Sequence, residues 1–154
     1  MAEIATLPDT EIASASLMLE PALSAPRRAR SFARESLCRW GEIEELIEAA
    51  VLIVSELATN AVCHGASVPA AEPEGAPDSF ISLTLALHCE SLQIEVFDGS
   101  SILPVRRAAG HESDCGRGIM IIEALAGSWA SGLVPDGGKW VRASLPRAVD
   151  ALAQ

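Results

Sequence analysis

Residues 55–65 read SELATNAVCHG, and they end a stretch whose apolar side chains recur at three- and four-residue steps. This spacing predicts a helix over residues 43–63 with one buried stripe. The predicted stripe consists of Ile47, Val51, Val54, Ala58 and Ala61. Glu56, Asn60 and His64 are spaced four residues apart, so they share a second face of the helix, which we expect to border a cleft or solvent.

A carboxylate one turn before a carboxamide suits a magnesium–nucleotide site. The amide oxygen of Asn60 can ligate a hard cation, and Glu56 can act as a general base or orient a nucleophile. A solvated helix face with an ordinary glutamate and asparagine has the same spacing. This motif alone therefore leaves both interpretations open.

The sequence around this helix predicts a compact mixed fold. A helix is expected before it at 25–40, with Pro26 in its first turn and Gly41 at its stop. A short third helix is expected at 118–126. Strands are expected at 14–20, 80–89, 92–97, 128–133 and 139–145. The order predicts an α+β two-layer sandwich, with helices on one face of a mixed, mostly antiparallel sheet.

The length and composition fit one globular domain. Hydrophobic residues make up 49% and charged residues 21% of the 154 residues, which is enough for a packed core. We expect the domain to span 14–147, between a loose N-terminus at 1–13 and a C-terminal tail at 148–154.

Charge and hydropathy narrow the class of function. The formal net charge of −10 disfavours binding of nucleic acid through a broad basic patch, because such a chain repels phosphates. No stretch is expected to supply the roughly 20 apolar residues of a membrane span, and the N-terminus lacks a signal-peptide pattern, so we expect a cytoplasmic protein. The cysteines contain no CxxC pair, and buried free thiols are expected at Cys38, Cys63, Cys89 and Cys115.

Two further motifs carry chemistry. In VFDGSS, residues 96–101, Asp98 ends a predicted strand, where its carboxylate can accept a hydrogen bond from an exocyclic amine such as that of adenine. In CGRGIMIIEALA, residues 115–126, Gly116 and Gly118 precede an apolar helix, so backbone N–H groups can face phosphate oxygens. Arg117 would add a cation there. Each motif is common by itself, as an Asp-Gly turn or a glycine pair before a helix.

Together the motifs are more specific. A helix with Glu-x-x-x-Asn precedes a strand ending in Asp-Gly, then Gly-x-Gly opens a helix, and Gly-Gly at 137–138 leads into the last strand. This order resembles the GHKL, or histidine kinase-like, ATPase superfamily. ELATNAVCHGA at 56–66 with GRGIMIIEALA at 116–126 resembles its anti-sigma-factor serine/threonine kinase branch. The resemblance covers about residues 14–146.

The resemblance implies a role for each motif residue. Glu56 would polarise the attacking hydroxyl, Asn60 would ligate Mg²⁺, and Asp98 followed by Gly99 would recognise the adenine of ATP. Backbone groups at 116–118 would contact phosphates, and 99–115 would form a lid. His64 is assigned a structural or capping role. The implied partners are an anti-anti-sigma antagonist and an RNA polymerase sigma factor, and the family also allows a homodimer.

Two departures from the family pattern bear on the site. The superfamily's Asp-x-Gly-x-Gly is replaced by Asp98-Gly99-Ser100-Ser101, and Lys139 stands where a threonine often follows Gly-Gly. Lys139 either contacts a phosphate or is a plain surface residue. Three hypotheses follow: an active kinase and anti-sigma factor, a binding module that regulates by sequestration alone, and a soluble domain without nucleotide.

Overall fold

The computed structural model describes residues 10–65, 80–99, 118–135 and 137–147. These residues form three helices and five strands in the order β1 (Glu11–Leu19), α1 (Ala25–Arg39), α2 (Glu44–Gly65), β2 (Ile81–His88), β3 (Ser91–Asp98), α3 (Gly118–Leu125), β4 (Ser128–Leu133) and β5 (Lys139–Pro146). The strands make one sheet in the order β1-β2-β3-β5-β4.

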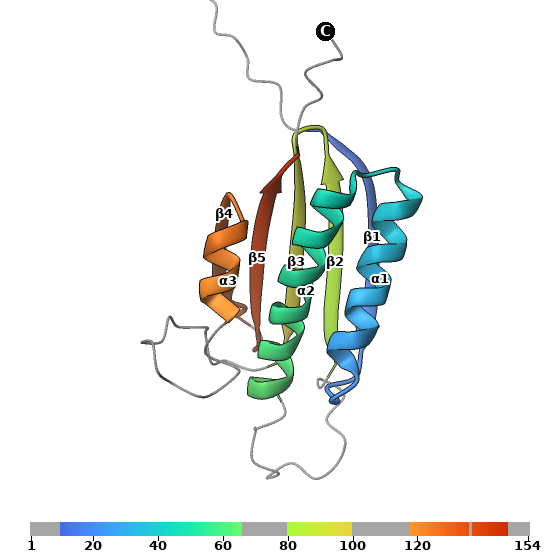
Figure 1. Ribbon diagram of the computed structural model, residues 1–154. Helices are drawn as coiled ribbons and strands as arrows, with labels where there is room; N and C mark the ends of the chain where they lie inside the picture. Colours follow the sequence, from blue (N-terminus) through green and yellow to red (C-terminus); the bar gives the residue numbers. More distant parts are fainter. Residues whose placement is uncertain (1–9, 66–79, 100–117, 136, 148–154) are drawn as a thin grey trace, which may run out of the picture.

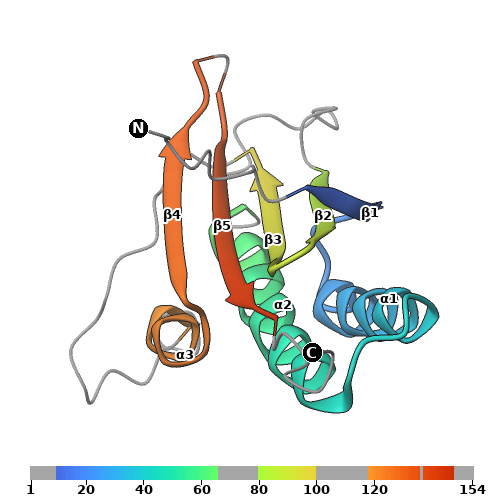
Figure 2. The ribbon, with the colours of Figure 1, turned by 90° about the horizontal axis from the view of Figure 1, so that it is seen from above.

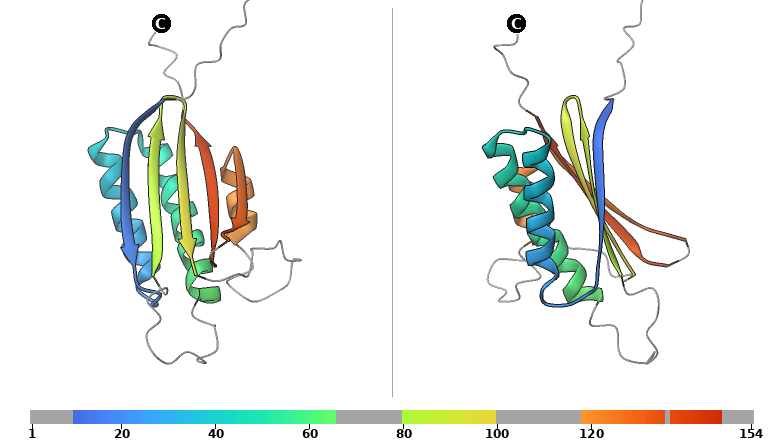
Figure 3. Two further views of the ribbon diagram at one scale, coloured as in Figure 1. Left: turned by 180° about the vertical axis from the view of Figure 1, so that it is seen from behind. Right: turned by 90° about the vertical axis from the view of Figure 1, so that its right-hand side faces the viewer.

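The architecture is a two-layer sandwich. All three helices lie on one face of the sheet (Figure 1, Figure 2), and the edge-on view in Figure 3 shows the other face without a helix. The predicted α+β sandwich is thus confirmed. All four strand pairings are antiparallel, so the described strands include no parallel pair where a mixed sheet was expected.

The helix α1 forms and stops for local reasons. Pro26 lies in its first turn, and Ala29, Ala33 and Leu37 are buried on one face. Gly41 has a φ of +80°, and the N–H of Glu42 donates to the carbonyl of Leu37, which closes the helix in a Schellman motif.

The central helix α2 lies between α1 and α3 and covers β3 and β5. Four of the five predicted stripe residues are buried, and the fifth, Val51, is partly buried against the core. From α1, Arg30 donates to the Ser55 hydroxyl at 3.0 Å, which ties the two helices together. The sheet contributes the other half of the core through alternate residues of β2, β3 and β5.

One part of α2 is long and apolar enough to cross a membrane. The segment Glu44–Cys63 meets this test by length and composition, which corrects our expectation that no stretch would. However, 56% of it is buried inside the domain, and the core helix of a soluble protein passes the same test.

The expectation of buried free thiols is confirmed only in part for the described cysteines. Cys38 and Cys89 are free but exposed, because they lie at the end of α1 and just after β2. Cys63, near the end of α2, is disulfide-bonded. Cys115 lies outside the described residues.

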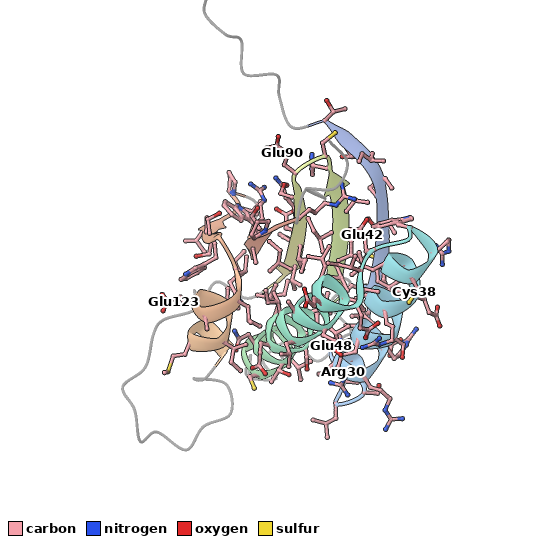
Figure 4. The ribbon with its side chains drawn as sticks, turned by 45° about the horizontal axis from the view of Figure 1, so that its top comes forward. Arg30, Cys38, Glu42, Glu48, Glu90 and Glu123 are labelled. Carbon is pink, nitrogen blue, oxygen red and sulfur yellow. The ribbon has the colours of Figure 1, made fainter. Side chains whose placement is uncertain are left out.

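Arg147 fastens the helical layer to the sheet. Its guanidinium donates to both carboxylate oxygens of Glu42, at 2.8 and 3.0 Å, and to the carbonyls of His88 and Cys89. Figure 4 shows Glu42, in the link between α1 and α2, and Glu90, in the β2–β3 turn, at the same end of the molecule. This clamp holds the α1–α2 link against the β2–β3 turn.

Candidate functional site

The ends of two helices and two strands lie at the end of the molecule opposite the Arg147 clamp. The C-terminal ends of α2 and β3 and the N-terminal ends of α3 and β5 all lie there (Figure 1). The sheet order places β3 beside β5, and α3 packs against α2. Motifs that are far apart in the sequence are therefore gathered at one end of the sandwich.

On α2, the two motif residues differ in environment. Glu56 is half-buried, whereas Asn60 is only 4% exposed, so of the two alternatives expected for this helix face, a cleft or solvent, exposure to solvent does not hold at Asn60. Neither the amide nitrogen nor the amide oxygen of Asn60 has a hydrogen-bond partner among the described residues. A buried polar side chain left unpaired costs about 1–3 kcal/mol, so such a group calls for a partner beyond the described residues.

Asp98 and Lys139 form a buried ion pair. The ammonium of Lys139 lies 2.9 and 3.0 Å from the two carboxylate oxygens of Asp98, and the side chains are 1% and 4% exposed for the lysine and aspartate. They are direct cross-strand partners on β3 and β5. Asp98 is therefore not the exposed carboxylate that its position at a strand end suggested, and Lys139 is not a surface residue.

The two side chains stabilise each other, because a buried charge is costly when its partner is removed. Removing one partner of a buried pair typically costs about 3–5 kcal/mol, since the other charge stays buried without compensation. Replacing both partners by apolar groups is often neutral or stabilising. The sign and size of the effect of a mutation at Asp98 thus depend on what stands at Lys139.

Two glycines bring β5 close to Asp98. Gly137 and Gly138 have φ values of +108° and +98°, which side chains rarely adopt. A Cβ on Gly138 would lie 2.6 Å from the carbonyl oxygen of Asp98 and 2.8 Å from Cζ of Phe97, whereas Gly137 has nothing within 4 Å. Only glycine at 138 lets β5 start this near the end of β3.

The remaining predicted residues are only partly described. Gly99 follows β3 in an exposed bend, and Gly118 is the first residue of α3. Gly116 and Arg117 lie outside the described residues, as does most of the proposed lid at 99–115. His64 lies in the last turn of α2.

Sequence reasoning missed the contact between Asp98 and Lys139 and the role of Gly138. The ion pair joins residues 41 positions apart, and it depends on the register of β3 against β5. One signal in the sequence could have placed Lys139. Side chains on one face of a strand recur at every second residue, and the apolar positions 141, 143 and 145 face the core. Position 139 is in phase with them, so its side chain faces the core too.

The residues that are present fit a magnesium–nucleotide site in part. The unpaired amide of Asn60 suits a cation ligand, and no group of three or more His, Cys, Asp or Glu side chains able to hold a metal occurs among the described residues. Mg²⁺ usually keeps waters and phosphate oxygens besides one or two protein ligands, so a single amide is compatible with it. Asp98 fits less well, because Lys139 occupies both of its oxygens.

The fold is a two-layer sandwich in which a helix carboxamide, Asn60, and a strand-end carboxylate, Asp98, lie toward the same end. The model of the histidine kinase-like ATPase domain matches residues 19–145, and the chain belongs to that family. Membership supports ATP as the ligand. No curated protein matches the chain in sequence.

Comparison with solved structures supports the same fold. One chain of the crystal structure of the SiaB–SiaC complex from Pseudomonas aeruginosa superposes with a TM-score of 0.56. The match covers 90% of this chain and 91% of that one, at 12% sequence identity. At this identity the likeness concerns the fold.

Proposed function

We propose that this chain is an ATP-binding anti-sigma factor with serine/threonine protein kinase activity. It phosphorylates an anti-anti-sigma partner and sequesters a sigma factor, and both roles place it in the cytoplasm. The observation that carries the proposal is Asn60, a buried amide with no protein partner among the described residues, one turn from the carboxylate of Glu56. A helix face with no ligand has no need to bury an unpaired amide.

Each residue has one task in this proposal. Bound ATP supplies the γ-phosphoryl group for transfer to a serine or threonine hydroxyl of the partner. The amide oxygen of Asn60 holds Mg²⁺, and the carboxylate of Glu56 orients that hydroxyl and accepts its proton. Backbone N–H groups at the start of α3, with Arg117, hold phosphate oxygens, because a helix N-terminus favours negative charge. Catalysis of this type consists mostly of positioning and charge stabilisation.

A partner protein is supported from two sides. The family resemblance implies one, and the solved SiaB–SiaC structure, which shares the fold, is a complex of two proteins. One difference between the two site residues favours a second candidate function: the Asn60 amide is unpaired among the described residues, whereas Asp98 has an ion-pair partner. Because Lys139 already pairs with Asp98, a module with weak nucleotide binding that regulates by sequestration alone is the alternative.

Calorimetry with Mg-ATP tests the nucleotide site first. We expect wild type to bind ATP more tightly with Mg²⁺ than without it, and Asn60→Ala to lose that magnesium dependence. Thr59→Ala, a neighbouring half-buried position of α2, is the matched control and should bind as wild type does. Equal affinity of Asn60→Ala and wild type, with and without Mg²⁺, would exclude this role of Asn60.

Phosphotransfer separates the two candidate functions. We expect purified anti-anti-sigma domains incubated with labelled ATP and wild type to acquire label on serine or threonine. Glu56→Gln should reduce transfer by about 10²–10⁴-fold, the usual contribution of a positioned general base, while still binding the partner. Partner binding by wild type without transfer to any domain favours the sequestering module.

A further inference from the structure

The carboxylate that is expected to recognise the adenine base already binds a side chain of the same protein. Asp98 is the residue to which the family resemblance assigns recognition of the adenine amine. In the structure both of its carboxylate oxygens accept hydrogen bonds from one ammonium, that of Lys139. Both side chains are almost fully buried, so water does not weaken the pair.

The backbone holds this arrangement in place. Asp98 and Lys139 are paired in register on β3 and β5, and Gly138 lets the two strands meet closely just before the lysine. A lysine at the first position of β5 therefore has its side chain directed toward Asp98 by the sheet. Phe97 stands beside Gly138 as well, so the start of β5 has little room to shift.

The chemistry of the ammonium resembles that of the ligand. An exocyclic amine of adenine is a neutral N–H donor, and the lysine ammonium is a charged one that forms shorter and stronger hydrogen bonds to a carboxylate. An adenine amine that took the place of Lys139 would exchange charged hydrogen bonds for a neutral one. It would also leave a buried ammonium without its counter-charge.

We propose that Lys139 is a specificity-determining residue that substitutes for the adenine amine on Asp98. Nucleotide then binds through its phosphates and the α2 face, while the amine contributes little, so the wild-type site does not distinguish adenine from a purine that lacks it. Replacing Lys139 by a neutral side chain removes the ammonium from both carboxylate oxygens of Asp98, which lets the amine bind there. The inference rests on the proposed function, because it takes the site to be a nucleotide site.

The test compares two nucleotides on two proteins by calorimetry. The ligands are Mg-ATP and the Mg²⁺ complex of purine riboside triphosphate, which differs only by lacking the amine. We expect wild type to bind both with similar dissociation constants. Lys139→Met should bind ATP about tenfold or more tightly than wild type does and should prefer it to the purine analogue by a similar factor, as a hydrogen bond to a charged acceptor predicts.

Two control variants keep the outcome specific. Lys139→Arg retains a cation against Asp98 and should remain unselective. Arg142→Met removes a cation from the opposite face of β5 and should bind both ligands as wild type does. A lysine with a purely structural role would change affinity for both nucleotides equally, and the ratio between them would not move.

The outcomes separate this inference from the proposed function. Wild-type protein that prefers ATP to the analogue about tenfold overturns the role of Lys139 and leaves the ATP site intact, since the amine is then already recognised. If folded Lys139→Met binds ATP more weakly than wild type does, the proposed role of Lys139 is likewise overturned and the ATP site is left intact. If folded wild type and Lys139→Met bind neither nucleotide, the ATP site itself is refuted, and this inference with it. The wild-type ratio decides the question even if the variant fails to fold.

Discussion

At the scale of single residues, the site combines one polar group that lacks a partner with one that has a strong partner. The amide of Asn60 is buried and unpaired among the described residues, whereas the carboxylate of Asp98 receives two hydrogen bonds from Lys139. Opposite consequences follow for mutation. Removing the Asn60 amide relieves a desolvation cost, and removing either member of the ion pair creates one.

The ion pair makes a prediction about stability that is independent of nucleotide. Lys139→Met should lower the free energy of unfolding by about 3–5 kcal/mol, because it removes the cation that bonds both oxygens of the buried Asp98 carboxylate. The double variant Asp98→Leu with Lys139→Met should regain most of that loss, since both charges are gone. Urea unfolding of wild type, both single variants and the double variant measures the coupling. Additive losses would show that the two side chains do not interact energetically.

At the scale of elements, local patterns predicted most of the fold. The helix α1 and the strand β4 lie where residues 25–40 and 128–133 were expected, because capping and alternation are local signals. The strand β1 begins three residues earlier than expected, at Glu11. Of its extra residues, Glu11 and Ile12 are exposed and Ala13 is partly buried. They belong to the strand because it pairs with β2, and this pairing leaves no pattern in the strand itself.

The site was less predictable than the fold. Glu56 and Asn60 share a helix, so their spacing was informative, and the family resemblance supplied Asp98. The contact of Asp98 with Lys139 depends on how β3 and β5 align after a long intervening segment. Alternation along β5 could have placed Lys139 on the core face, but no sequence pattern names the residue opposite it.

The turn before β5 gives a prediction at this scale. Gly138→Ala should destabilise the protein more than Gly137→Ala does, although both glycines have positive φ values. Both variants bear a backbone cost of about 1–3 kcal/mol, but only at 138 does the new Cβ meet backbone of Asp98 and the ring of Phe97. Overpacking adds about 1–3 kcal/mol there. Thermal unfolding of both variants checks the difference, and equal losses would mean that the strands separate freely at this point.

At the scale of the whole molecule, the proposed nucleotide site and the Arg147 clamp lie at opposite ends of the sandwich. The elements of the proposed site meet at the end where α2 and β3 finish, and the Arg147 clamp lies at the other end (Figure 1, Figure 4). The clamp ties the α1–α2 link to the β2–β3 turn through Glu42 and two carbonyls. Because no described contact of Arg147 reaches the site, its contribution should appear in folding and leave nucleotide affinity unchanged.

We therefore expect Arg147→Met to lower the free energy of unfolding by about 2–4 kcal/mol, since it leaves the carboxylate of Glu42, 7% exposed, without its bidentate partner. Arg34→Met is the matched control: it breaks an ion pair with Glu44 whose side chains are 46% and 60% exposed, and such pairs contribute about 0–1 kcal/mol. Urea unfolding and ATP calorimetry on the same preparations provide the two measurements. A changed dissociation constant for ATP in folded Arg147→Met would show that the two ends are coupled through the α2 helix, and the sandwich would then transmit strain along its length.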